Sequence, residues 1–253
     1  MERFRWWICV GLNYGFLVAM AVGVERDIRL DGLTVTPIYH GTVWVTLQEG
    51  DQAWHVAVDP WKQAPLPKDK KAHLILVTDV HHDHMDAEAI RSVAAPDVDV
   101  VAPPAVVREL KGVLTGVKLH ELANGQTWTW RSLQVEAVPM YNTSPDRAQY
   151  HTKGRGNGYV LQFRKTRVYI AGDTQCTPEM RALKNIDLAL VPINLPYTMD
   201  ADEAAQCVKA FRPRQVVPYH YQVGQADPDR FVDLLRDEKD ITVSRVLDGK
   251  ERP

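Results

Sequence analysis

The chain lacks any strong excess of charge. Its 30 lysines and arginines nearly balance its 32 aspartates and glutamates, which leaves a formal charge of −2 over 253 residues. This balance gives no reason to expect nucleic acid or an anionic membrane surface as the main partner. Charge runs, low-complexity tracts and long linkers are also missing. We therefore expect no nucleic-acid partner, and one domain or two closely fused halves over residues 25–253.

Cysteine is scarce as well, with three in the chain. Cys9 belongs to the N-terminal segment, so Cys176 and Cys207 are the pair that the folded domain retains. In an oxidising compartment such a pair can form a disulfide. As small, buried hydrophobic residues the two cysteines need no covalent partner. From the sequence we favour the second interpretation.

The N-terminus carries a targeting pattern. Arg3 and Arg5 precede an uncharged run from Trp6 to Val24, and Ala19-Met20-Ala21 has the small-x-small form of a signal-peptidase site. Residues 1–24 are therefore predicted to be a signal peptide, with the mature protein periplasmic or secreted. An uncleaved single-span anchor, which would bring membrane contact, is one alternative. A buried N-terminal helix of a cytosolic domain is the other.

The remaining chain divides into two similar runs of strands, each followed by helices. Strands are predicted where β-branched and aromatic residues alternate or cluster between turn residues: Leu33–Tyr39, Thr42–Gln48, Trp54–Val58, His73–Val77, Asp97–Val101, Gln126–Trp130, Leu133–Val138, Gly158–Phe163, Arg167–Ala171, Ile186–Val191 and Gln215–Pro218. Capping residues and apolar stripes predict helices at 86–93, 103–110, 178–183, 200–211 and 229–236. The pattern fits an α/β fold of the four-layer αββα type.

A cluster of metal-binding residue types follows the predicted buried strand His73–Val77. Asp79, His81, Asp83 and His84 lie within six residues. Carboxylate oxygen and imidazole nitrogen are good ligands for zinc, manganese or iron. A chance cluster in a solvated loop is the alternative, but this loop lies between a buried strand and a helix cap. The sequence therefore predicts a metal site.

This loop resembles a motif of a known family. Val77-Thr78-Asp79-Val80-His81-His82-Asp83-His84 is similar to the His-x-His-x-Asp-His loop of the metallo-β-lactamase superfamily, with Asp79 in place of the first histidine. Further segments resemble other motifs of its lactonase-like and phosphodiesterase-like branch, in the same order along the chain: Tyr39-His40-Gly41-Thr42, Val58-Asp59-Pro60, Ile170-Ala171-Gly172-Asp173-Thr174 and Pro218-Tyr219-His220. The resemblance covers most of the chain after about residue 33, and it implies the αββα sandwich of that family.

The resemblance implies a binuclear metal centre. Two metal positions are expected, with ligands carried over from the family motifs: Asp79 and His81 at the first, Asp83, His84 and His220 at the second, and Asp173 between them. Asp59 is expected to orient a ligand histidine. Zinc is the expected cofactor, as one or two ions. Manganese and iron are alternatives because carboxylate ligands are hard.

The sequence departs from the family at two points. A histidine is expected after Val138-Pro139, where the chain has Met140, Tyr141 and Asn142. Tyr141 or Asn142 completes the first position, or a loop supplies His151, or that position is weak. In addition, three carboxylates would face the two ions, so we expect the centre to be less positive and to acidify a bound water less than a histidine-rich one.

Five residues are candidates for the substrate pocket. His151, Lys153 and Arg155 lie in a glycine-containing loop that suggests recognition of an anionic group. Tyr197 follows a strand end, and His40 follows the first predicted strand. Their alternatives are a solvated flexible loop, a helix entry and a satisfied core histidine.

Taken together, the resemblance implies a metal-dependent hydrolase that uses a metal-bound hydroxide to cleave an ester, lactone or phosphodiester bond. The expected substrate is a small molecule with an anionic group. Asp83 is the predicted catalytic residue, which orients the water or takes its proton. The alternatives are a di-iron redox protein on the same fold and a non-catalytic binding protein with a degraded metal site.

Overall fold

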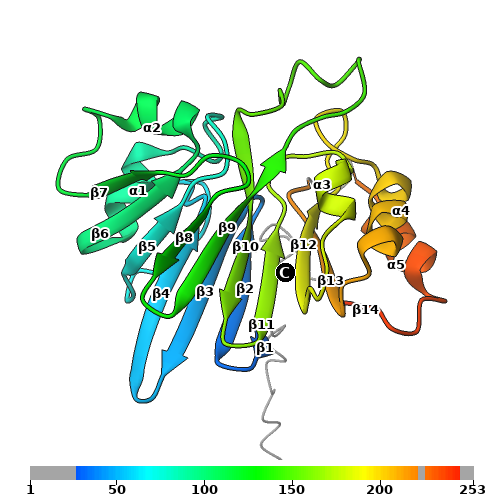
Figure 1. Ribbon diagram of the computed structural model, residues 1–253, viewed down its shortest axis with the longest axis horizontal. Coiled ribbons are helices and arrows are strands. Elements are labelled where there is room, and N and C mark those ends of the chain that lie inside the picture. The colour runs from blue at the N-terminus through cyan, green and yellow to red at the C-terminus, as the bar shows by residue number, and fades with distance from the viewer. Residues whose placement is uncertain (1–26, 222–225, 246–253) are drawn as a thin grey trace, which may run out of the picture.

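Two β-sheets pack face to face, and helices cover their outer faces (Figure 1). The computed structural model describes residues 27–221 and 226–245. Each sheet has seven strands, one in the order β1-β2-β3-β4-β5-β6-β7 and the other in the order β14-β13-β12-β11-β10-β9-β8. This is the four-layer αββα sandwich that the sequence predicts. The predicted signal segment, residues 1–24, lies outside the described residues.

The first sheet uses the first half of the chain. Its elements are β1 (Ile28–Leu30), β2 (Leu33–Tyr39), β3 (Thr42–Glu49), β4 (Gln52–Val58), β5 (Ala72–Leu76), α1 (Ala87–Val93), β6 (Ala94–Ala102), α2 (Pro104–Leu110) and β7 (Lys118–Glu121). Strands β1 to β4 pair antiparallel. Strands β4 to β7 pair parallel. Parallel pairing requires crossover connections, and α1 lies in one of them.

The second sheet repeats this division. Its elements are β8 (Thr127–Trp130), β9 (Leu133–Met140), β10 (Gly156–Phe163), β11 (Thr166–Ile170), α3 (Pro178–Arg181), β12 (Leu188–Pro192), α4 (Ala201–Phe211), β13 (Gln215–Tyr219), α5 (Pro228–Leu235) and β14 (Thr242–Val243). Strands β8 to β11 pair antiparallel. Strands β11 to β14 pair parallel. The second half therefore repeats the architecture of the first.

Three apolar layers hold the sandwich together. The central layer joins the inner faces of the two sheets and includes Val45 and Leu74 from the first and Tyr159 and Leu161 from the second. A second layer packs α1 and α2 on the first sheet. A third packs α3, α4 and α5 on the second sheet. Burial on both faces explains why β12 is a continuous apolar run and why β5 is apolar except at His73.

Three short strands of the described chain, β1, β7 and β14, were not predicted from the sequence. Strands β1, β7 and β14 have three, four and two residues. Runs of that length are too short to show a periodic pattern. None of the helices in the described residues is both long and apolar enough to cross a bilayer.

The cysteine prediction was wrong, because Cys176 and Cys207 form a disulfide. The bond joins the segment before α3 to the middle of α4, which packs against the same face of the second sheet. The two residues are 31 positions apart in the chain, and their proximity depends on how the helices pack. Sequence pattern alone does not carry that information.

The ends of the parallel strands meet at one edge of the sandwich. The loops that follow β4, β5, β11, β12 and β13 bring polar residues to this edge, namely Asp59, Asp79 to His84, Asp173, Asn194 and His220. The long connection between β9 and β10 adds His151 to the same place. Ligand sites in α/β sheets form at the carboxyl ends of parallel strands.

Candidate metal centre

The loop between β5 and α1 turns tightly enough to aim several side chains inward. The backbone N–H groups of His84 and Met85 both donate to the carbonyl of His81, at 3.0 and 2.8 Å. Asp86 ends the loop as the N-cap of α1, and its side chain accepts from Glu88 N and Ala89 N. Asp79 and His84 are fully buried.

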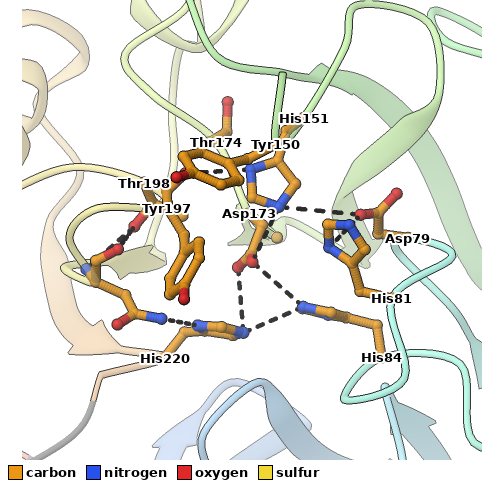
Figure 2. Close-up of polar contacts among 12 residues, drawn as sticks. Asp79, His81, His84, Tyr150, His151, Asp173, Thr174, Tyr197, Thr198 and His220 are labelled. Atoms are coloured by element: carbon orange, nitrogen blue, oxygen red, sulfur yellow. Dashed lines mark hydrogen bonds and ion pairs between the residues drawn. The ribbon is translucent and has the colours of Figure 1, made fainter. Parts of the chain in front are cut away.

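Three donor atoms converge at one point of this centre (Figure 2). His84 Nε2 lies 3.1 Å from His220 Nε2, and Asp173 Oδ2 lies 3.4 Å from His84 Nε2. Asp173 Oδ1 lies 3.2 Å from His220 Nε2. Ligands at zinc bond lengths in a tetrahedral site lie about 3.3 Å from one another. The three side chains therefore have the mutual spacing of ligands to one ion.

Asp83 completes this group. Its Oδ2 atom lies 3.7 Å from His84 Nε2 and 3.5 Å from His220 Nε2. The same oxygen lies 3.3 Å from Nε2 of His40. Asp83, His84, Asp173 and His220 together offer two nitrogens and two carboxylates. We call this set the second position.

Asp59 fixes the orientation of His84. Its Oδ2 lies 2.7 Å from His84 Nδ1, and its other contacts come from the backbone N–H and the hydroxyl of Thr78. A carboxylate on Nδ1 places the proton there and leaves Nε2 as a lone pair that points toward Asp173 and His220. The carboxylate is 1% exposed, so water does not compete for this contact.

Three further residues form a second group of donors, which we call the first position. His81 Nδ1 lies 3.1 Å from Asp79 Oδ2. His151 Nε2 lies 4.0 Å from the same Asp79 oxygen and 3.3 Å from Asp173 Oδ2. Asp173 Oδ2 therefore faces both positions. This is the arrangement expected of a carboxylate that bridges two ions.

His151 occupies the place of the histidine that the sequence appeared to lack. Asn142 holds the connection in place, because its backbone N–H donates to the His151 carbonyl at 2.8 Å. Its side-chain nitrogen also lies 3.2 Å from His151 Nδ1. Tyr141 points elsewhere and donates its hydroxyl to Glu179. Of the three open alternatives, the structure brings His151 into the cluster.

The donor atoms fit a metal ion better than they fit one another. His151 Nε2 is buried and makes no hydrogen bond of good geometry with the described residues, although Asp173 Oδ2 lies 3.3 Å away. Buried polar atoms without partners are rare, and an ion is one of the partners that satisfies them. The His84 and His220 Nε2 atoms face each other at 3.1 Å, where one ring can donate a hydrogen bond to the other or both can bind one ion. The described residues thus provide three adjoining groups able to hold a metal ion, the third being His40, Asp83 and His220.

The carboxylates and histidines of the centre shift one another's pKa values. Burial lowers the pKa of His84, but the charges of Asp173 and Asp59 outweigh it and raise that pKa well above 6.5. Burial raises the pKa of Asp173, yet His220 and His84 bring it well below its usual value. Asp83 behaves alike: hydrogen bonds from His220 and His40 outweigh burial and lower its pKa. In the metal-free centre, protons on histidine therefore balance the carboxylates.

Backbone strain accumulates at the centre. His40, Asp59 and His220 have φ values of 52°, 46° and 50°. Non-glycine residues seldom adopt this left-handed region, and those that do cluster at functional sites. Gly41 allows the β2–β3 turn to approach closely, since a Cβ there would lie 2.9 Å from His220 Cδ2. The turn thus packs directly on a metal-binding histidine.

Arg155 changes the expected charge of the centre. Its guanidinium donates to both oxygens of Asp79, from Nε at 2.9 Å and from Nη2 at 2.7 Å. The sequence led us to expect three uncompensated carboxylates, but one of them is neutralised. Arg155 therefore does not present its charge to solvent. The expected drop in positive charge does not follow from the Asp79 substitution.

Lys153 is directed away from the centre. Its ammonium group pairs with Glu179 at 2.9 Å and lies over the ring of Tyr141. Arg147, on the same loop, donates two hydrogen bonds to Glu203 at the start of α4. The loop cations thus serve internal ion pairs, and Lys153 is absent from the pocket lining in the part of the chain that the structure describes.

A pocket of about 360 Å³ opens onto both positions. His40 and Tyr197, two of the predicted pocket residues, line it, and so do Trp61, Tyr150 and Asn194. Sequence reasoning missed these last three. The Tyr150 and Tyr197 rings meet edge to face at 5.1 Å, and Trp61 stacks on Tyr39 at 5.8 Å. A tryptophan directly after the Asp59-Pro60 strand end was the available signal for Trp61.

Comparison with known proteins agrees with this geometry. Residues 51–221 match the family model of the beta-lactamase superfamily domain. A UPF0173 metal-dependent hydrolase of Thermococcus onnurineus is 30% identical over 200 residues, which cover 74% of this chain and 88% of the relative. Another, from Thermoplasma acidophilum, is 34% identical over 191 residues, covering 70% and 81%.

Solved structures show the same fold. A Parabacteroides distasonis protein superimposes with a TM-score of 0.77 and 38% identity, over 87% of this chain and 96% of its own. A metallo hydrolase from Ignicoccus hospitalis gives a TM-score of 0.69 and 26% identity, over 86% and 96%. The chain therefore belongs to the metallo-β-lactamase superfamily and is a metal-dependent hydrolase.

Proposed function

We propose that this hydrolase cleaves an ester, lactone or phosphodiester bond in a small-molecule substrate that enters the pocket above His40, Trp61 and Tyr197. The convergence of Asp83, His84, Asp173 and His220 carries this proposal, because each of the two carboxylates lies between 3.2 and 3.7 Å from both histidine nitrogens. Zinc is the proposed ion, with manganese or iron as alternatives. When bound, the ions supply an acidified water and polarise the substrate oxygen.

Asp83 is the proposed catalytic residue. Its low pKa keeps the carboxylate ionised, which makes it a weak base and favours a role in orienting the water that attacks. The Asp83 side chain is 17% exposed and borders the pocket. Of the two roles that the sequence suggested, orientation is therefore the one that we propose.

His40 supports Asp83 from the pocket side. Burial lowers the pKa of its imidazole, so the ring is neutral at physiological pH and carries a single N–H. Its Nε2 atom lies 3.3 Å from Asp83 Oδ2. His40 can donate that proton to Asp83 and hold the carboxylate against the centre. Its ring also packs on His220, with centroids 3.8 Å apart.

The pocket walls favour a substrate with an apolar or aromatic group next to the bond that is cleaved. Trp61, Tyr150 and Tyr197 line the pocket, and Tyr197 is 45% exposed. Because Arg155 and Lys153 pair with Asp79 and Glu179, we no longer assign them recognition of a substrate anion. An anionic oxygen would instead meet the ions.

We further propose that the protein works outside the cytoplasm, as the N-terminal pattern predicts. The Cys176–Cys207 disulfide supports this location, because structural disulfides persist in oxidising compartments. Fractionation of cells that express the full chain tests it. Recovery of the disulfide-bonded protein in the cytoplasmic fraction would contradict the proposal.

The hydrolytic proposal is tested with the purified protein, loaded separately with zinc, manganese and iron(II). Turnover of p-nitrophenyl esters, simple lactones and bis(p-nitrophenyl) phosphate would be compared. We expect Asp83→Asn to lower kcat by about a hundredfold or more. His120→Asn is the matched control, since His120 pairs with Asp99 at 2.7 Å outside the centre. Turnover that Asp83→Asn leaves unchanged would contradict the proposed role.

A further inference from the structure

Arg155 and Asp79 form a buried ion pair at the edge of the first position. Asp79 has no exposed surface, and the Arg155 side chain is 22% exposed. Besides the two bonds to Asp79, Arg155 Nη2 donates to the carbonyl of Tyr150 at 2.5 Å. It also lies 3.3 Å from His81 Nε2. The guanidinium is therefore fixed in place by four contacts.

This arrangement places a permanent positive charge beside one metal position. Arginine stays protonated at every pH that proteins tolerate. The Asp79 oxygen that faces His81 and His151 is Oδ2, the oxygen that also accepts from Arg155 Nη2. An ion bound to this oxygen would share it with the Arg155 guanidinium, and the two positive charges would repel each other. In addition, Arg155 already neutralises the negative charge of the Asp79 carboxylate.

The second position has no such neighbour. Among the residues that the structure describes, the basic side chains within 4.0 Å of the Asp83 carboxylate are all histidines, namely His40, His82, His84 and His220. Histidines can lose a proton when an ion binds, whereas Arg155 cannot. The two halves of the centre therefore differ in fixed charge although, apart from the shared Asp173, each has one carboxylate and two histidines.

We propose that Arg155 makes the two metal positions unequal. The second position, with Asp83, His84, Asp173 and His220, binds its ion tightly. The first, with Asp79, His81 and His151, binds an ion weakly, because the Arg155 charge opposes it. This inference deepens the proposed function and rests on it. Arg155 is here a residue that sets metal affinity through Asp79, not a group that touches substrate.

Zinc titration of the metal-free protein tests this inference without any assay of activity. Bound zinc is counted by mass spectrometry after gel filtration, and affinities are measured against a competing chelator. The wild-type chain is expected to bind one zinc ion tightly and a second at least about a hundredfold more weakly. Arg155→Met should bind the weakly held ion, at the first position, at least about tenfold more tightly. Its affinity for the tightly held ion, at the second position, should be unchanged.

Two variants separate charge from geometry. Arg155→Lys keeps the positive charge but loses the two-pronged contact with Asp79. Its affinity for the ion at the first position should therefore remain low. Arg230→Met is the matched control, since Arg230 makes a comparable two-pronged pair with Asp202 away from both metal positions. It should leave both zinc affinities unchanged.

A further variant guards against misfolding, because Arg155→Met leaves a buried carboxylate unpaired. Asp79→His combined with Arg155→Met removes both charges and should bind two zinc ions with similar affinity. Equal affinity of the wild type for both ions would overturn the inference alone. So would loss of the ion at the first position in Arg155→Met if Arg155→Lys retains that ion. A wild-type chain that binds no ion would overturn the proposed function as well.

Discussion

His84 and His220 stack with their ring planes 6° apart and their Nε2 atoms 3.1 Å from each other. The two residues are 136 positions apart in the chain and come from the two different sheets. Each ring is held from behind, His84 by Asp59 and His220 by Asn194, whose Nδ2 lies 3.3 Å from His220 Nδ1. The two Nε2 atoms thus lie close enough to each other to bind one ion.

Loss of the Asp59 charge should weaken metal binding. In Asp59→Asn the amide retains the size of the side chain but no longer fixes the proton on His84 Nδ1 as strongly. We expect zinc affinity at the second position to fall by about 10- to 100-fold, measured by chelator competition. Asp99→Asn is the control, because Asp99 contacts His120 in the same way outside the centre. Equal effects of the two substitutions would contradict the role given to Asp59.

A methyl group at residue 41 should disturb the centre through His220. The Cβ of Gly41→Ala would lie 2.9 Å from His220 Cδ2 and 3.3 Å from His84 Cε1. We expect about 1–3 kcal/mol of destabilisation from overpacking, together with weaker zinc binding. Gly50→Ala is the comparison, since its Cβ meets nothing within 4 Å. That variant should cost stability through its positive φ yet bind zinc as the wild type does.

Three sequence motifs were enough to group the residues of the second position, because these residues follow the ends of β5, β11 and β13. The first position was less predictable. His151 reaches it through a folded connection whose course depends on Asn142 and on the ion pair between Arg147 and Glu203. The role of Arg155 depends on a contact with Asp79, 76 positions away. Such contacts arise from packing, which periodicity and local motifs do not encode.

The same distinction holds for the fold. Apolar runs and caps predicted the longer strands and the five helices of the described residues, since each carries a local signal in its own residues. Asp200, for example, forms a capping box with Glu203 at the start of α4. The Cys176–Cys207 bond was missed because it joins elements that meet only after the second sheet and its helices have assembled.

Removal of this disulfide should lower stability without removing the metal ligands. The bond closes a loop between positions 31 apart, and loops of this size contribute about 2–4 kcal/mol. Cys176→Ser combined with Cys207→Ser should therefore unfold at lower denaturant concentration with an unchanged zinc stoichiometry. Thiol titration of the denatured, unreduced protein offers a direct check. Free thiols at both Cys176 and Cys207 would contradict the disulfide.

The raised pKa of His84 predicts opposite pH dependences for the metal-free and the metal-loaded protein. In the metal-free protein, the protonated ring contributes stability that is full below pH 6.5 and is lost as pH rises through the raised pKa. An ion requires the deprotonated ring, so zinc affinity should rise over the same range. Thermal unfolding between pH 6.5 and 9 should show stability falling without zinc and the zinc-dependent increment growing. Parallel pH profiles would count against His84 as a ligand.

The position of the bound ion is the most direct test of the central claim. Crystals of the zinc-loaded protein should give a strong anomalous peak at the zinc edge within about 2.0–2.2 Å of ligand atoms from His84, His220, Asp83 and Asp173. A second peak of lower occupancy is expected between Asp79, His81 and His151. A fully loaded protein with its strongest peak elsewhere would contradict the account.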